Sequence, residues 1–141
     1  LFIFAIAIHN FPEGMAVGVA FGGSDAKAGT KLALGIGLQN IPEGLAVAFP
    51  LFREKSTRLR AFTVALCTGL VEPVGGFLGI SIVSMGSFLL PYGLAFAAGA
   101  MLFVISEEII PETHSRGNDR KATIGVIAGF IIMMILDTAF S

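Results

Sequence analysis

Apolar residues occur in five long runs along this chain, separated by short polar stretches. The runs cover residues 1–21, 32–52, 61–83, 89–110 and 122–140. Each contains about 19–23 residues, close to the ~20 that an α-helix needs to cross the ~30 Å hydrocarbon core of a bilayer. The pattern therefore predicts an all-α, polytopic transmembrane helix bundle with five spanning helices.

The composition favours a membrane protein over a soluble one. Apolar residues make up 55% of the chain, charged residues only 13%, and the mean hydropathy is +0.85. A soluble domain needs roughly a quarter of its residues charged to cover its exterior. The net charge of −1 leaves no basic surface for phosphates, so we expect a lipid bilayer around the chain and no nucleic-acid partner.

Basic residues are divided unevenly between the two sides of the predicted bundle. In the connections after the first and third runs, the only basic residues are Lys27 and Lys31. The other two connections contain Arg53, Lys55, Arg58, Arg60, Arg116, Arg120 and Lys121. Because short loops rich in Lys and Arg stay in the cytoplasm, the first run is predicted to cross outward and the chain to end on the outer side.

The chain begins at Leu1, inside an apolar run, with no initiator methionine and no basic leader. A cleaved signal peptide would not hold His9, Asn10 and Glu13 in its middle. We therefore expect residues 1–141 to form a single transmembrane domain, the C-terminal part of a longer protein.

One nine-residue motif occurs twice. HNFPEGMAV at residues 9–17 returns as QNIPEGLAV at residues 39–47, thirty residues later. Because consecutive spans run in opposite directions, the copies form an inverted repeat with a pseudo-two-fold axis in the membrane plane. Glu13 and Glu43 each lie about 18 Å along their segments, near the midplane. A carboxylate there costs ~2.5–3.5 kcal/mol on insertion scales, so a proton, a partner or a bound cation must neutralise it.

The spacing within the motif groups donor side chains on one face of each helix. His9 lies four residues before Glu13. Gln39 has the same relation to Glu43 on the next helix. A first metal position is therefore geometrically available among these four side chains, and each carboxylate has two oxygens with which to bridge a second ion.

A second metal position would use residues slightly further around each helix. Asn10 and Asn40 precede the two glutamates by three residues. Glu72 lies at a matching depth in the third run and is also followed by proline, so we interpret it as a further ligand. The alternative for Glu72 is a lone carboxylate paired with a neighbouring helix. This second position would share Glu13 and Glu43 with the first.

Pro12 and Pro42 stand directly before the two glutamates. Each removes a backbone donor and frees the carbonyl four residues earlier. A free carbonyl at membrane depth is tolerated where it faces protein or a watery cavity, and it can help to dehydrate a cation. A simple helix kink is the alternative, and the adjacent glutamate favours a site.

The cytoplasmic end of the fourth run carries the acidic sequence EEIIPETH at residues 107–114. Acidic helix ends usually face water and aid solubility, which is one interpretation. The alternative is an exit site for metal, with Glu108, Glu112 and His114 as weak ligands.

These motifs resemble the ZIP (Zrt-, Irt-like) family of zinc and iron permeases. The HNFPEG and QNIPEG pair is the most specific signature of that family, and LVEP at residues 70–73 and EEIIPE at residues 107–112 agree with it. Gln39, where many members have histidine, is similar to the bacterial GufA-like branch. The resemblance implies an eight-helix fold, of which this chain would be the last five helices, and a homodimer.

The resemblance also implies a binuclear metal centre. The first ion would be held by His9, Glu13, Gln39 and Glu43. The second would be held by Asn10, Glu13, Asn40, Glu43 and Glu72, with both repeat glutamates bridging. The family's second helix, which normally adds ligands or gating residues, is not part of this sequence, so the first position is incomplete here.

We interpret the chain as part of a transporter that moves zinc, and also iron, manganese or cadmium, into the cytoplasm across the inner membrane of a bacterial cell. The metal is the transported ligand. One imidazole among oxygen donors argues against Cu(I), and no phosphate-binding motif for a nucleotide is present. We expect no enzyme, because the chain lacks the H-E-x-x-H motif of an intramembrane metalloprotease. The alternatives are a metal-binding membrane protein with a sensing or structural role and, less in keeping with the motifs, an intramembrane metalloenzyme.

Overall fold

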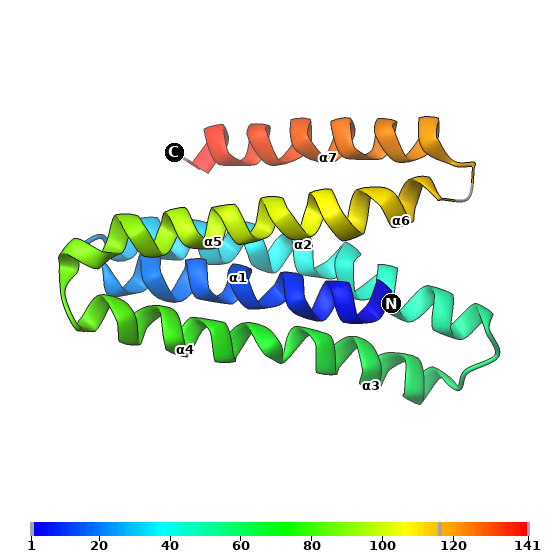
Figure 1. The fold of residues 1–141 in the computed structure, drawn as a ribbon, viewed down its shortest axis with the longest axis horizontal. Coiled ribbons are helices and arrows are strands. Elements are labelled where there is room, and N and C mark those ends of the chain that lie inside the picture. Colours follow the sequence, from blue (N-terminus) through cyan, green and yellow to red (C-terminus); the bar gives the residue numbers. More distant parts are fainter. Residues whose placement is uncertain (1, 116, 141) are drawn as a thin grey trace.

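Helices account for almost all of residues 2–115 and 117–140, the part of the chain that the computed structural model describes (Figure 1). The first two crossings are α1 (Phe2–Gly22) and α2 (Ala26–Arg53). The third consists of α3 (Arg58–Gly69) and α4 (Val71–Ser84). The fourth consists of a 3₁₀ turn (Ser87–Leu89), α5 (Leu90–Val104), a π-helical turn (Ile105–Ile109) and α6 (Ile110–His114). The fifth is α7 (Asp119–Phe140).

These helices confirm the fold predicted from the hydrophobic pattern. Among the described residues, four helical segments are long and apolar enough to cross a membrane: Ile3–Gly22, Ala26–Arg53, Arg58–Ser84 and Ser87–Glu107. The fifth predicted span corresponds to α7, a helix of 22 residues. Each crossing lies antiparallel to the one before it in the chain (Figure 1).

Short polar segments end the helices where the sequence turns. The Asp25 carboxylate accepts hydrogen bonds from the backbone N–H groups of Lys27 (2.9 Å) and Ala28 (3.2 Å), and so caps the start of α2. Thr57 caps α3 in the same way through the N–H of Arg60 (3.2 Å). The α2–α3 connection and the adjoining ends of α6 and α7 lie at one end of the bundle, which gathers the Arg- and Lys-rich segments on one side (Figure 1).

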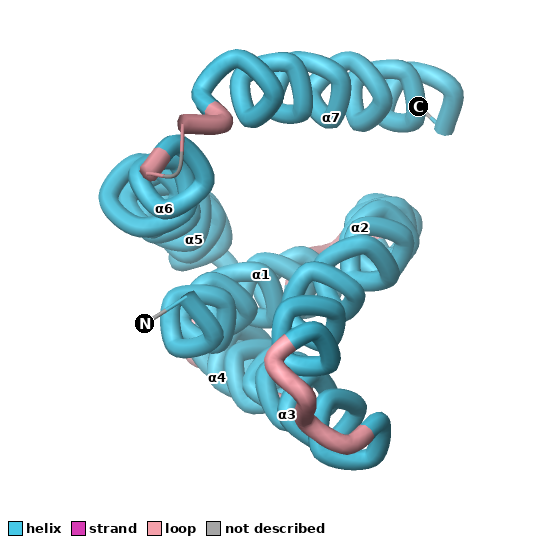
Figure 2. The backbone as a smooth tube through the Cα atoms, turned by 90° about the vertical axis from the view of Figure 1, so that its right-hand side faces the viewer, coloured by secondary structure: helices cyan, strands magenta, loops and turns pink. Residues whose placement is uncertain are grey.

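Helix α1 lies at the centre of the bundle, in contact with α2, α4 and α5 (Figure 2). The buried core forms around it and consists of Met15, Ala16, Val19, Val83 and Ala97. By contrast, α7 has few contacts with the other helices. The central position of α1 surrounds the first copy of the repeat with protein on several sides.

Glycines allow α1 and α4 to pack backbone against backbone. A Cβ atom added to Gly14 would overlap the carbonyl oxygen of Glu72, and one added to Gly18 would overlap that of Gly76. Because the obstructing atoms belong to the backbone, neither helix can accommodate a side chain there without moving. At Gly125, by contrast, an added Cβ would meet no described heavy atom within 4 Å.

The third crossing contains a break that the hydrophobic pattern did not predict. α3 ends at Gly69, Leu70 forms a turn, and α4 begins at Val71. Pro73 supplies the physical reason, because its missing N–H leaves the carbonyl of Gly69 without a helical donor. Pro12 and Pro42 lie inside continuous helices instead.

Candidate metal centre

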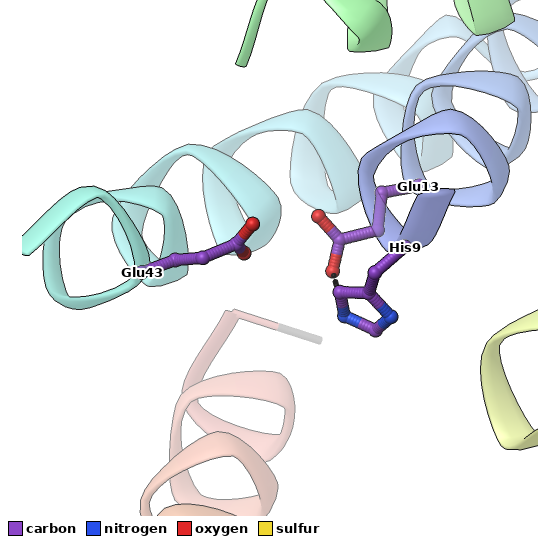
Figure 3. A group of neighbouring side chains, drawn as sticks. All are labelled: His9, Glu13 and Glu43. Atoms are coloured by element: carbon purple, nitrogen blue, oxygen red, sulfur yellow. Dashed lines mark ion pairs between the residues drawn. The ribbon is translucent and has the colours of Figure 1, made fainter. Parts of the chain in front are cut away.

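Three predicted ligands on α1 point into the protein interior. His9, Asn10 and Glu13 are all buried, and Glu13 is only 1% exposed. The imidazole Nε2 of His9 lies 3.0 Å from Oε1 of Glu13, as expected for residues four apart on one helix face (Figure 3). This burial places a histidine–carboxylate pair at the centre of the bundle, where an unneutralised charge is costly.

The second copy of the repeat faces this pair from α2. The Gln39 side-chain amide donates a hydrogen bond to the same Glu13 oxygen that faces His9. The half-buried Glu43 carboxylate points toward Glu13 and His9 (Figure 3). One ligand atom from each of His9, Glu13 and Glu43 lies within 4.8 Å of the other two, close enough for a single cation to contact all three. The four residues predicted for the first metal position are therefore brought together.

Of the residues predicted for the second position, Asn40 and Glu72 are joined directly by hydrogen bonds, whereas Asn10 is held by a backbone carbonyl of the third crossing. The Asn40 amide donates to both carboxylate oxygens of Glu72, at 2.8 and 2.9 Å. The Asn10 amide donates to the backbone carbonyl of Thr68 at 3.1 Å, next to the break between α3 and α4. Both side chains use their N–H groups in these bonds and retain their oxygens as acceptors.

Five buried side-chain atoms have no hydrogen-bond partner among the described residues. They are His9 Nδ1, Asn10 Oδ1, Glu13 Oε2, Asn40 Oδ1 and Glu43 Oε1. A buried polar atom without a partner costs about 1–3 kcal/mol, and such atoms are rare in folded proteins. All five belong to predicted metal ligands, and the four oxygens can act only as acceptors when the two carboxylates are ionised. A bound cation would satisfy such a set of atoms.

Comparison with known proteins assigns the chain to a family. The family model described as "ZIP Zinc transporter" matches residues 1–137. The chain belongs to the ZIP family. It is 53% identical over 137 residues to the zinc transporter GufA of Myxococcus xanthus. The aligned stretch covers 97% of this chain and 54% of that protein.

Two further ZIP relatives show a similar extent of match. Identity is 48% over 139 residues with the zinc transporter ZIPB of Bordetella bronchiseptica, covering 99% of this chain and 45% of that protein. Identity is also 48% over 143 residues with the zinc transporter ZIP11 of Homo sapiens, covering 97% of this chain and 42% of that protein. The predicted resemblance to the GufA-like branch is thus confirmed. This ZIP chain spans about half the length of the curated relatives it matches.

Of the residues predicted for an exit site in this ZIP chain, the structure describes one side chain. His114 donates through Nδ1 to the carbonyl of Ile110 (2.8 Å), and its Nε2 forms a hydrogen bond with Oγ1 of Thr123 (3.2 Å). The second of these contacts connects α6 to the first turns of α7. The side chains of Glu108 and Glu112 lie outside the described part, so the exit site stays a prediction.

Thr68 is a residue of the centre that the sequence did not indicate. Its backbone carbonyl accepts the Asn10 hydrogen bond and so orients the amide of a predicted ligand. Every residue has a backbone carbonyl, so no residue type could have indicated this contact. The Glu72-Pro73 pair gave no direct indication either, because a proline at position 73 frees the carbonyl of Gly69 rather than that of Thr68.

Proposed function

We propose that the protein to which this chain belongs moves divalent transition metals, with zinc as the principal substrate, across the membrane into the cytoplasm. The observation that carries the proposal is the set of five unpartnered buried atoms on the two copies of the repeat. The names of the relatives, all zinc transporters, support zinc as the cargo. Iron, manganese and cadmium are further substrates that the mixed nitrogen and oxygen donors can accept.

The metal would bind as cargo, in two adjacent positions. In the first, the imidazole of His9 supplies a nitrogen donor beside Gln39, and this position favours zinc. In the second, Asn10, Asn40 and Glu72 supply only oxygens, so that position is more permissive. Glu13 and Glu43 contribute to both positions.

The chemistry of the ligands also suggests how an ion is released. A metal needs the imidazole neutral and the carboxylates ionised, so protons compete with metal for the same atoms. When the ion leaves, the hydrogen bonds from Gln39 to Glu13 and from Asn40 to Glu72 partly replace it. In this proposal the gradient of the ion itself drives uptake.

The surroundings of the full protein follow from the same proposal. The Arg- and Lys-rich end of the bundle would face the cytoplasm of a bacterial cell, with the helices in its inner membrane. The homodimer implied by the family resemblance would be checked by measuring the mass of the purified protein in detergent.

The proposal is tested by zinc flux into vesicles that contain the full-length transporter. A zinc-sensitive dye inside the vesicles reports uptake, and Glu43→Ala should abolish it. Glu54→Ala is the matched control, because Glu54 is exposed at the end of α2 and should leave uptake unchanged. Zinc binding without flux in the wild-type protein would favour a sensing or structural role instead.

A further inference from the structure

The connection between α2 and α3 carries a dense group of positive charges, which we call the basic turn. It consists of Arg53, Lys55, Arg58 and Arg60. Glu54 is the one acidic residue in this stretch, so four positive charges and one negative charge leave +3. The side chains of all five residues are exposed. None of them has an ion-pair partner among the residues that the structure describes.

The backbone of the basic turn holds a lysine where glycine is usually found. α2 ends in a Schellman motif, in which the N–H of Ser56 donates to the carbonyl of Leu51 and the N–H of Lys55 to that of Phe52, both at 3.2 Å. The left-handed position of this motif favours glycine, because a side chain there is strained. Lys55 occupies it with a φ of 63°. A cytoplasmic loop could carry its basic residues at any neighbouring position, so a lysine at the strained one favours a role for its charge at this place.

A second cation of the basic turn is held by an aromatic ring. The guanidinium carbon of Arg58 lies 5.9 Å from the centre of the Phe52 ring, which is a cation–π contact. Leu59, between Arg58 and Arg60, is 74% exposed. This apolar side chain between two arginines lies at the end of a membrane-spanning helix. Such a place combines contact with acyl chains and contact with headgroups.

The two ends of the bundle differ in this respect. At the outer end, the α1–α2 connection contains Asp25, whose carboxylate caps α2, and the α4–α5 connection contains no charged residue. The basic turn lies at the opposite end, together with the start of α7, where Arg120 and Lys121 follow Asp119 (Figure 1). This end is predicted to face the cytoplasm, where anionic phospholipids give the membrane surface a negative potential.

We propose that the basic turn binds the phosphate groups of anionic phospholipids in the cytoplasmic leaflet, and so fixes the α2–α3 end of the bundle at the membrane surface. Three of its four cations are arginines, and a guanidinium can donate two parallel hydrogen bonds to one phosphate. Arg58 is oriented for this contact by Phe52, and Lys55 adds a charge from the strained position. The inference does not depend on the metal centre, because neither residue belongs to it.

The test measures phospholipid binding to the purified full-length transporter in detergent. Phosphatidylglycerol and phosphatidylcholine with the same acyl chains are titrated separately, and native mass spectrometry counts the bound molecules. The wild-type protein should prefer phosphatidylglycerol. Arg58→Gln combined with Arg60→Gln should lower its affinity for that lipid roughly fivefold for each charge removed, and leave phosphatidylcholine binding unchanged. Lys27→Gln combined with Lys31→Gln is the matched control, since it removes the same charge from the outer end and should keep the wild-type preference.

A second variant separates lipid binding from folding. Lys55→Gly removes one cation but suits the left-handed backbone, so the protein should be at least as stable as wild type and still bind phosphatidylglycerol about fivefold more weakly. Zinc binding, which should be unchanged in every variant, shows that the proteins are folded.

Three results would overturn the proposal. The first is equal affinity of the wild-type protein for the two lipids. The second is an equal loss in the variants of the basic turn and in the outer control, which would show a response to total charge alone. The third is displacement of phosphatidylglycerol by inorganic phosphate at equal concentration, which would show that the basic turn takes free phosphate instead of a lipid headgroup.

Discussion

The two copies of the repeat have nearly the same sequence but different surroundings. Glu13, on the central helix α1, is 1% exposed and faces both His9 and Gln39. Glu43, on α2, is half-buried, while one oxygen of each carboxylate, Oε2 of Glu13 and Oε1 of Glu43, has no partner among the described residues. The comparison teaches that the same motif can lie in two environments, and that the neighbouring helices decide how deeply each predicted ligand is buried.

The largest expected effect comes from removing either bridging carboxylate. Glu13→Ala and Glu43→Ala should each lower zinc affinity by about 100-fold or more, ~2.8 kcal/mol at 1.4 kcal/mol per tenfold, because each carboxylate is proposed to serve both ions. Calorimetric titration of the full-length protein measures this loss. Near-normal affinity in the Glu43→Ala protein, with loss only in the Glu13→Ala protein, would mean that the first copy binds metal alone.

A second prediction concerns packing beside the first copy. Gly14→Ala places a methyl group against the backbone of Glu72, so α1 and α4 must separate. Overpacking of this kind typically costs ~1–3 kcal/mol, and more where the backbone must move. Thermal unfolding of the purified protein should show a clear fall in Tm. Gly37→Ala on α2 is the matched control, since its added Cβ meets no described heavy atom within 4 Å; an equal fall in both variants would remove the argument from close packing.

Many features of this centre could be predicted from the sequence, because they depend on periodicity. The length of the apolar runs predicts the helices, and the four-residue spacing predicts that His9 and Glu13 meet. The repeat predicts that Gln39 approaches the same site from the opposite direction, and its hydrogen bond to Glu13 is consistent with this.

Other features depend on contacts that leave no trace in residue type. The break at Leu70 brings the carbonyl of Thr68 to Asn10, and neither the break nor the contact follows from hydropathy. The π-helical turn at Ile105–Ile109 is equally hidden, since its residues would suit an α-helix. The pairing of Gly14 with α4 rather than with another helix is likewise seen only in the structure.

The third prediction separates the two ion positions. Glu72→Gln removes one charge with little change in shape, and only the second position is proposed to use this residue. The variant should bind one zinc ion in place of two, with the affinity of the remaining ion within about threefold of wild type, ~0.7 kcal/mol. Titration with stoichiometry as the readout checks this. If the first ion is weakened to the same degree, the division of ligands is wrong.

The smallest expected effect sharpens the comparison between the copies by exchanging their first residues. Gln39→His gives the second copy the imidazole of the first, and should raise zinc affinity over manganese about tenfold. His9→Gln removes that imidazole and should reduce the same ratio by a similar factor. Competition between zinc and manganese for the purified transporter measures both. Equal selectivity in the two variants would show that imidazole does not set the preference.

The central claim is that both copies of the repeat hold a pair of ions between them. The most direct measurement is anomalous scattering at the zinc absorption edge from crystals of the full-length transporter grown with zinc. The account predicts two peaks beside the carboxylates of Glu13 and Glu43, one toward His9 and one toward Glu72. A single peak, or peaks that contact the residues of only one copy, would contradict it.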